Sequence, residues 1–222
     1  MRAVRLWIKK EGRAKYISHL DMNRCFTRAV RRAKLNLWYT EGFNPHPYLC
    51  FLAPLSLGQE SDGEPLDIRI EDDMTDSEIM KRMNDVLPEG IGVVRVHEAF
   101  SKAAEIVYAS YILRLEFPSE EIAKSFTEQA KSLVDGGELY AEKLGKQGRK
   151  KVTKQVCVCE KMRSFSVRCD GETVQMDVVL NAGNDMLNPT LLVDALQKAT
   201  DTTPFVSIRR TGFFKADMQA FA

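Results

Sequence analysis

The most constrained stretch of backbone in the sequence is a short loop that places a histidine between two prolines. It consists of Glu41, Gly42, Phe43, Asn44, Pro45, His46 and Pro47. The proline rings fix φ on both sides of His46, and a following proline restricts a residue towards extended conformations. Imidazole is the side chain whose ordinary pKa, about 6.5, lies closest to neutral pH. The loop is therefore suited to ligand capture or to proton transfer.

His19, at the expected start of a helix, is the second candidate for acid–base chemistry. Two histidines with a tyrosine can cleave RNA without a metal, because a base that removes the 2′-hydroxyl proton starts attack on the adjoining phosphate. A loop histidine is more often a hydrogen-bonding tether than a catalyst, and a histidine at a helix start is more often structural. Catalysis by His46 with His19 is therefore the alternative hypothesis.

Arginines recur on one side of the helix that is expected to begin at Ser18. Arg24, Arg28 and Arg31 are spaced i, i+4 and i+7, which places them on one stripe of an α-helix, opposite its apolar stripe. Such a stripe can neutralise phosphates, and Arg32 extends it. The alternative is a solvated face paired with acidic residues elsewhere.

The strand expected at residues 3–10 alternates, and its outward side would carry Arg5 and Trp7. A basic and aromatic strand face is of the kind that stacks single-stranded bases. The alternative is that Trp7 packs at a contact between two parts of the protein. In a ferredoxin-like sheet, Arg95 and His97 would lie on the neighbouring strand.

The formal charge of +1, from 32 Lys and Arg against 31 Asp and Glu, is a cancellation between segments. Residues 1–50 hold 11 basic and 3 acidic side chains, residues 51–92 hold 3 and 11, and residues 143–168 hold 9 and 1. The last segment includes an expected glycine-punctuated loop with Arg149, Lys150 and Lys151, which can follow a phosphate backbone. The three net charges, +8, −8 and +8, predict local contacts with RNA and exclude indiscriminate adhesion to polyanions.

Signatures of metal, nucleotide and hydrolase chemistry are missing from the sequence. Its three histidines have no recognised metal spacing, and Cys157 and Cys159, expected on one strand face, have no second pair nearby, so packing is favoured over a metal site. The sequence has no phosphate-binding GxxxxGK[ST] motif and no dinucleotide, serine-hydrolase or zincin motif. We therefore expect no cofactor.

Five reduced cysteines and no apolar run of about 18–20 residues favour a cytoplasmic protein without a membrane partner.

The periodicity predicts the same order of elements twice: strand, helix, strand, strand, helix, strand. Helix starts are expected at Ser18, Thr75, Ser119 and Asn188, where each residue can cap the backbone. This order predicts an α+β fold, a tandem duplication of ferredoxin-like βαββαβ units with antiparallel sheets. The expected domains are residues 1–102 and 103–222.

Three runs of residues resemble the radical SAM-linked protein family, a bacterial domain of unknown function found alone or fused behind a radical SAM protein. They are Tyr-Ile-Ser-His-Leu-Asp at 16–21, the stretch 39–47 around the proline-flanked histidine, and Arg-Arg-Thr-Gly-Phe at 209–213. Members of that family are commonly encoded beside a radical SAM partner and near ribonuclease G and ribosomal protein genes. The resemblance therefore implies a radical SAM protein as partner and a role related to RNA or translation. Where the family has a carboxylate after the basic loop, this chain has Thr153, and its CxC lies outside the family pattern.

The leading hypothesis is a non-catalytic accessory protein that binds or presents RNA, in an rRNA or tRNA context, to a separate radical SAM enzyme. The sequence itself lacks the three-cysteine cluster of such enzymes. The first alternative is a metal-independent RNA endonuclease or modification enzyme that uses His46. The second is a protein adaptor without RNA binding, in which the acidic residues between Glu60 and Glu89 dock a basic partner.

Overall fold

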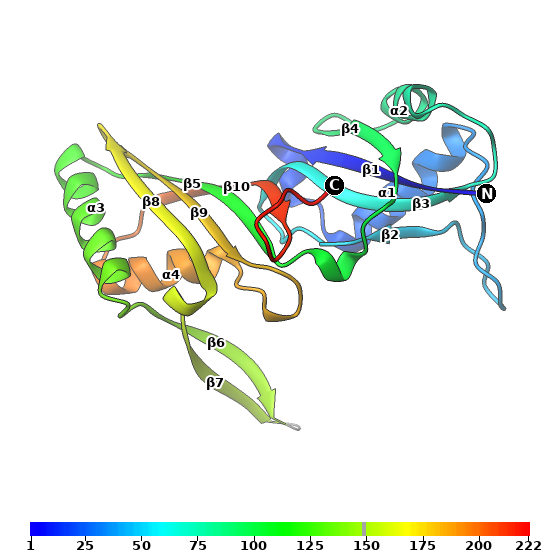
Figure 1. Ribbon diagram of the computed structural model, residues 1–222. Coiled ribbons are helices and arrows are strands. Elements are labelled where there is room, and N and C mark those ends of the chain that lie inside the picture. The colour runs from blue at the N-terminus through cyan, green and yellow to red at the C-terminus, as the bar shows by residue number, and fades with distance from the viewer. Residues whose placement is uncertain (148–149) are drawn as a thin grey trace. The chain divides into compact units, whose positions relative to one another are not determined.

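Two α+β units make up the chain, and the structure, a computed structural model, describes residues 1–147 and 150–222 (Figure 1). The first unit contains residues 1–105 together with Ala222, and the second contains residues 106–221. Among the described residues, every strand pairing within a unit is antiparallel. The predicted α+β class is therefore confirmed.

The first unit has the order strand, helix, strand, strand, helix, strand. Its elements are β1 (Arg2–Lys10), α1 (His19–Arg32), β2 (Leu49–Phe51), β3 (Glu60–Ile70), α2 (Asp76–Asn84) and β4 (Ile91–Glu98). The strands lie side by side in the order β4-β1-β3-β2. Leu6 and Ile8 of β1 and Leu66 and Ile68 of β3 are fully buried, and they share one core with Phe26 of α1. Apolar residues of α2 join the same core, so both helices cover one face of this sheet.

Helix α1 begins where the sequence predicts it. The Ser18 hydroxyl accepts a hydrogen bond from the Asp21 backbone N–H (3.2 Å) and donates one to the Asp21 carboxylate (2.7 Å), so it satisfies a backbone donor that the helix leaves open. Met22, Phe26 and Ala29 are buried at i, i+4 and i+7. This apolar stripe fixes the rotation of α1, and its arginines consequently face solvent.

The second unit repeats the element order around a different insertion. Its elements are β5 (Tyr108–Glu116), α3 (Glu120–Asp135), β8 (Met162–Asp170), β9 (Thr173–Asn181), α4 (Pro189–Thr200) and β10 (Phe205–Phe214). The strands lie in the order β10-β5-β9-β8, which matches β4-β1-β3-β2 position by position. Along β5, Tyr111, Leu113 and Leu115 are buried, whereas Ser110 and Arg114 lie on the opposite face.

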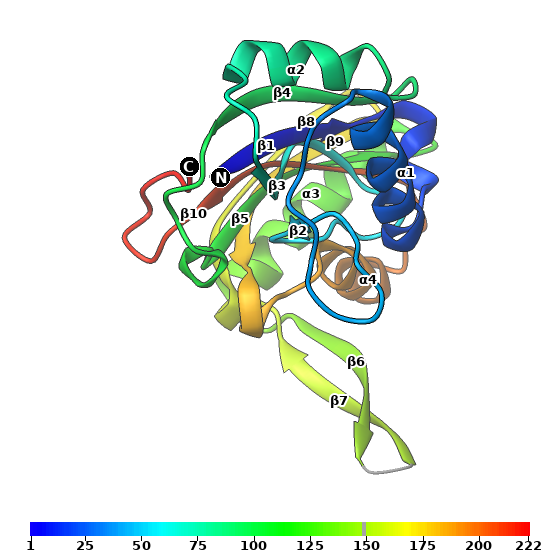
Figure 2. The same cartoon turned by 90° about the vertical axis from the view of Figure 1, so that its right-hand side faces the viewer.

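A hairpin stands where the basic loop was expected. Strands β6 (Tyr140–Gln147) and β7 (Lys150–Cys157) pair in unbroken register from Tyr140 opposite Cys157 to Gln147 opposite Lys150. The base of the hairpin is anchored, because Leu139 and Val158 are buried. In Figures 1 and 2 the hairpin extends away from α4 of the same unit. The loop prediction is therefore wrong for the paired residues.

Two further findings concern membrane-spanning helices and cysteines. Within residues 1–147 and 150–222, no helix is both long and apolar enough to cross a membrane. All five cysteines carry free thiols.

Candidate functional site

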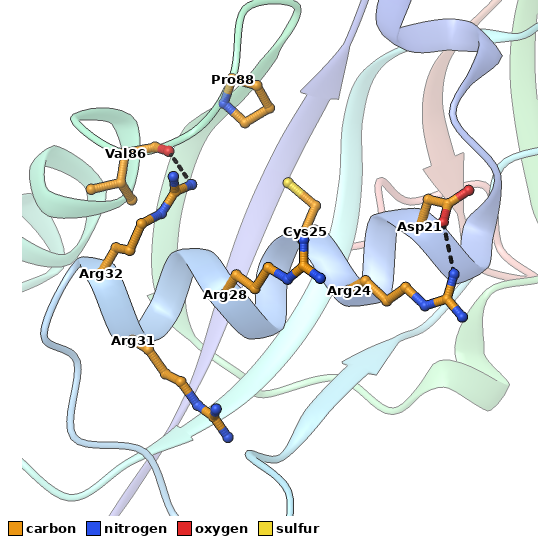
Figure 3. A pocket seen from close by; sticks show the side chains of 8 residues that line it. All are labelled: Asp21, Arg24, Cys25, Arg28, Arg31, Arg32, Val86 and Pro88. Atoms are coloured by element: carbon orange, nitrogen blue, oxygen red, sulfur yellow. Dashed lines mark hydrogen bonds and ion pairs between the residues drawn. The ribbon is translucent and has the colours of Figure 1, made fainter.

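A groove of about 750 Å³ runs along the solvent side of α1 (Figure 3). Its lining residues are Asp21, Arg24, Cys25, Arg28, Arg31, Arg32, Val86 and Pro88. Four guanidinium groups thus meet one carboxylate, which makes the groove electropositive. The structure brings together the three predicted stripe residues and adds to them a wall from a distant part of the first unit.

The arginines of the groove differ in how firmly they are held. Arg32 donates to the Val86 carbonyl (2.7 Å), and Arg24 donates to the Asp21 carboxylate (3.1 Å). Arg31 makes a long hydrogen bond of 3.4 Å from Nε to the Tyr39 hydroxyl. In the described part of the chain no acidic side chain forms an ion pair with Arg28. Its guanidinium group is therefore available to an anion from solution.

The wall opposite α1 is fixed by the turn that ends α2. The backbone N–H groups of Val86 and Leu87 both donate to the Met83 carbonyl, at 3.1 and 3.0 Å. Gly90 closes the turn with φ of +80°, and a Cβ atom there would lie 2.6 Å from the Glu11 carbonyl oxygen. Only glycine tolerates both conditions without strain. The turn thus holds Val86 and its carbonyl in reach of Arg32.

Local electrostatics keep the groove positive at neutral pH. Hydrogen bonds from Ser18 and Arg24 lower the pKa of Asp21, which is therefore ionised and offsets a single arginine. Burial raises the pKa of the Cys25 thiol, and the charges of Arg32 and Arg28 oppose that rise only in part. Cys25 is consequently neutral at pH 7. Guanidinium groups remain charged at any physiological pH and form paired hydrogen bonds with phosphate or carboxylate oxygens.

The expected outward face of β1 is wrong, because that strand is buried on both sides. The Arg5 side chain is 0% exposed, and its Nε and Nη2 atoms donate to the two Asp67 carboxylate oxygens at 2.7 and 3.0 Å. Its Nη2 and Nη1 atoms also donate to the carbonyls of Ser101 (2.6 Å) and Ala222 (2.8 Å). The segment after β4 and the C-terminal residue therefore cover Arg5, and no phosphate can reach it.

Trp7 is likewise part of the interior, at 6% exposure. Its indole N–H donates to Nε2 of His97 (2.8 Å), and the Arg95 guanidinium lies 4.4 Å from the centre of its ring. Arg95 and His97 do lie on the neighbouring strand, opposite Trp7 and Arg5, as predicted. Trp7 is thus already stacked on a cation of its own chain, and its ring is closed to a base.

His46 lies in a tight hairpin loop, exposed to solvent. The Thr40 backbone N–H donates to the His46 carbonyl (2.9 Å), and the His46 N–H donates to the Thr40 hydroxyl (3.2 Å). The His46 Nδ1 atom lies 3.1 Å from both the Thr40 hydroxyl and the Asn44 carbonyl. These bonds fix the imidazole to its own loop. Phe43, at the tip, is fully exposed, and Gly42 has φ of +126°.

His19 makes a separate set of contacts. Its Nε2 atom lies 3.0 Å from the Asn23 amide nitrogen, and its ring meets Phe51 edge-on with 5.2 Å between ring centres. Among residues 1–147 and 150–222, no hydrogen bond or ring contact joins His19 to His46. The structure therefore does not assemble the expected pair of imidazoles.

Three other predicted positions are Arg149, Lys150 and Lys151. Arg149 lies outside the described residues. Lys150 and Lys151 belong to β7, opposite Gln147 and Lys146, and their side chains are also outside the described part. The backbone thus assigns two of the three predicted residues to a strand.

In the part of the chain that the structure describes, no three His, Cys, Asp or Glu side chains are placed so that they could hold a metal ion together. Strand β7 ends at Cys157, whereas Cys159 opens a short 3₁₀ turn, so the expected shared strand face is wrong. The two thiols lie 3.9 Å from the carbonyls of Gly137 and Val134, near the end of α3.

Sequence reasoning missed Cys25, Val86 and Pro88 as lining residues of the groove. Cys25 follows Arg24 directly and gave no charge signal. Val86 and Pro88 lie more than 50 positions from the arginine stripe in sequence and read only as the end of a helix. Nothing local in the sequence indicates that this turn faces α1.

Comparison with solved structures identifies a similar fold. A chain of the Cbf5-Nop10-Gar1 complex matches 96% of this chain at a TM-score of 0.50 and 12% identity. This protein spans 50% of the length of that chain, and the likeness shows the fold alone. An unknown protein from Galdieria sulphuraria aligns over 94% of this chain and 98% of its own, at a TM-score of 0.25 and 10% identity.

No curated protein matches the sequence. A family model does: DUF2344, described as an uncharacterized protein conserved in bacteria, matches residues 3–189. The matched range includes β1, α1 with its arginines, and the proline-flanked histidine loop. The chain therefore belongs to the DUF2344 family.

Proposed function

We propose that the protein is a non-catalytic accessory protein that binds RNA through the α1 groove and presents it to a separate radical SAM enzyme. The observation that carries the proposal is the groove itself, with Arg28 unpaired among the described residues and Arg24 and Arg31 beside it. The radical SAM partner and the rRNA or tRNA context rest on the resemblance of residues 16–21, 39–47 and 209–213 to the radical SAM-linked family. The strand orders β4-β1-β3-β2 and β10-β5-β9-β8 support two ferredoxin-like units as the scaffold.

The spacing of the arginines suits a strand of phosphates. A rise of 1.5 Å per residue puts Arg24 and Arg31 about 10 Å apart along α1. Phosphates of one stacked strand recur about every 3.4 Å along its axis, so the row spans about three of them. The groove therefore fits a short run of nucleic-acid backbone.

The adaptor hypothesis is weaker, because several of the eleven acidic side chains of the acidic segment are already paired within the first unit. Asp67 holds Arg5, Asp76 pairs with Arg2 and Glu78 pairs with Arg82. The endonuclease hypothesis is weaker for a different reason: the imidazoles of His19 and His46 have separate partners. Neither alternative has an observation that favours it over the groove.

The test is an RNA-binding titration over a salt series. A variant with Arg24→Gln, Arg28→Gln and Arg31→Gln is compared with the wild type by fluorescence anisotropy of labelled RNA, both structured and single-stranded. Removing three phosphate contacts should reduce the slope of log affinity against log salt by about 2 for a single strand. In the wild type, these three contacts should therefore account for a loss of affinity of about 20-fold between 50 and 200 mM salt, and the variant should lack this part of the salt dependence.

The matched control removes the same charge elsewhere, with Lys81→Gln, Lys102→Gln and Lys131→Gln at exposed positions that do not line the groove. Its salt slope should change by less than half as much. An equal loss of salt slope in both variants would mean that binding depends on the net charge of the protein and not on the groove. Binding that is absent in the wild type, or indifferent to salt, would overturn it. Co-purification of the radical SAM partner without RNA would favour the adaptor.

A further inference from the structure

The sheet of the second unit has one apolar and one polar face. Apolar residues of β5 and β9 alternate into the buried face, against which α3 packs. The residues between them lie on the other face and are hydroxylated or charged for most of its length. Serines and threonines are small, so this face is hollowed into two adjoining depressions, of about 340 and 390 Å³.

The smaller depression is lined by two arginines, Arg114 and Arg168, and one carboxylate, Asp170, so its net charge is positive. Arg114 of β5 and Arg168 of β8 both lie opposite Gln175 of the intervening β9, so the three side chains form one row across three strands. Neighbouring strands are about 4.8 Å apart, which puts the two arginines about 10 Å apart, with Gln175 between them. Both are exposed, and neither forms an ion pair with a described residue. Their long side chains can converge on one anion above Gln175.

The larger depression has a largely apolar lining that includes Ile112 and Val179, and its polar groups are the Asp177 carboxylate and several hydroxyls. Asp177 lies two residues along β9 from Gln175, whose amide nitrogen donates to both of its carboxylate oxygens, at 3.0 and 3.3 Å. Among the described residues no basic side chain pairs with Asp177. Ser166 lies opposite it on β8, and Ser110, whose hydroxyl is 2.8 Å from that of Thr211, lines the same depression. A carboxylate held in this way is a good acceptor for sugar hydroxyls, as it is for the ribose in dinucleotide sites.

We propose that this face binds a phosphorylated ribose, with the phosphate on Arg114 and Arg168 and the ring hydroxyls on Asp177. Two residues along a strand span about 7 Å, which is comparable with the separation of the phosphate and the ring hydroxyls in ribose 5-phosphate. Gln175 links the two ends, because it lies between the arginines and orients the carboxylate. The site shares no residue with the α1 groove and does not rest on the proposed function of that groove.

The test is isothermal titration calorimetry of the full chain with ribose 5-phosphate, ribose and inorganic phosphate. Ribose 5-phosphate should bind more tightly than either fragment. Arg114→Gln with Arg168→Gln should weaken its binding at least about tenfold, since each charge-assisted hydrogen bond is lost. Asp177→Asn should weaken ribose 5-phosphate and leave inorganic phosphate unchanged. The control Arg163→Gln, also exposed on β8 but outside both depressions, should change neither.

Two arms separate the sources of the ligand. AMP represents a free nucleotide, and a short single-stranded oligoribonucleotide represents a nucleotide within RNA. The source of the ligand is the one of these two that binds more tightly and whose binding is weakened by the Arg114 and Arg168 substitutions. The Arg24, Arg28 and Arg31 variant should still bind ribose 5-phosphate even where it has lost RNA, so the two proposals fail independently. Absence of ribose 5-phosphate binding at millimolar concentration, or binding unchanged by the arginine pair of substitutions in a variant with wild-type circular dichroism, would overturn the inference.

Discussion

Replacing Asp67 by alanine should destabilise the first unit by about 3 kcal/mol. The change removes the carboxylate that pairs with Arg5, whose side chain is 0% exposed, and removing one partner of a buried ion pair costs about 3–5 kcal/mol. We expect the lower end of that range because the Asp67 side chain is 18% exposed and part of the gap can admit water. The carbonyls of Ser101 and Ala222 still accept from Arg5, which also limits the loss.

Urea denaturation followed by tryptophan fluorescence measures this cost in the right part of the molecule. Both tryptophans, Trp7 and Trp38, lie in the first unit, so the signal reports unfolding of that unit. The partly exposed helix pair of Arg82 and Glu78 provides the control in the same unit: Arg82→Ala should cost about 0.5 kcal/mol or less.

A double-mutant cycle completes the measurement. Arg5→Met combined with Asp67→Ala should cost less than the sum of the single changes, by about 0.5–3 kcal/mol, because the second change removes a charge that the first has stranded. An Asp67→Ala cost no larger than that of the exposed control pair would refute the reasoning that Asp67 compensates a desolvated Arg5.

Four more predictions concern α1 and the histidine loop. Ser18→Ala should lower the unfolding free energy by about 1 kcal/mol in urea denaturation, because it removes the helix cap. The pKa of Asp21 is lowered on folding, so its ionised form adds stability at neutral pH that is lost as the pH falls below the ordinary value of 3.8 and through the folded pKa; the stability difference between wild type and Asp21→Asn should therefore vanish in acid. Arg28→Gln should raise the pKa of the Cys25 thiol further, seen by mass spectrometry as slower alkylation by iodoacetamide at pH 8. His46→Ala should leave the affinity for labelled RNA unchanged, and on a denaturing gel the RNA should stay intact with both wild type and variant. Cleavage by the wild type that the variant loses without losing binding would favour the endonuclease.

Local signals in the sequence predicted the elements well. Each helix begins at the predicted cap, where Ser18, Thr75, Ser119 and Asn188 accept hydrogen bonds from backbone N–H groups within the next three residues. Capping and apolar periodicity depend on neighbours in sequence, so they can be read without the fold. The arginine stripe of α1 followed from the same periodicity.

Contacts between distant residues were beyond the sequence. Alternation along β1 indicated a half-buried strand, but it carries no information on Asp67, Ser101 or Ala222, which together enclose Arg5. The hairpin of β6 and β7 was missed because its lysines and glycine resemble a solvated loop, whereas pairing depends on register between two segments. The histidine loop was recognised as rigid, and the tether reading agrees with its hydrogen bonds.

The lysines of the β6–β7 hairpin bear on whether a further strand can pair with it. A sheet of two strands consists entirely of edges, and an unpaired edge is a template for a strand from another molecule. Here Lys143 lies opposite Lys154 and Lys146 opposite Lys151, so cations recur along both strands at matching heights. A second copy added at either edge would bring further lysines into that row, and like charges on neighbouring strands repel. From the strand register and the lysines in the sequence we infer that pairing of a further strand with this hairpin is disfavoured.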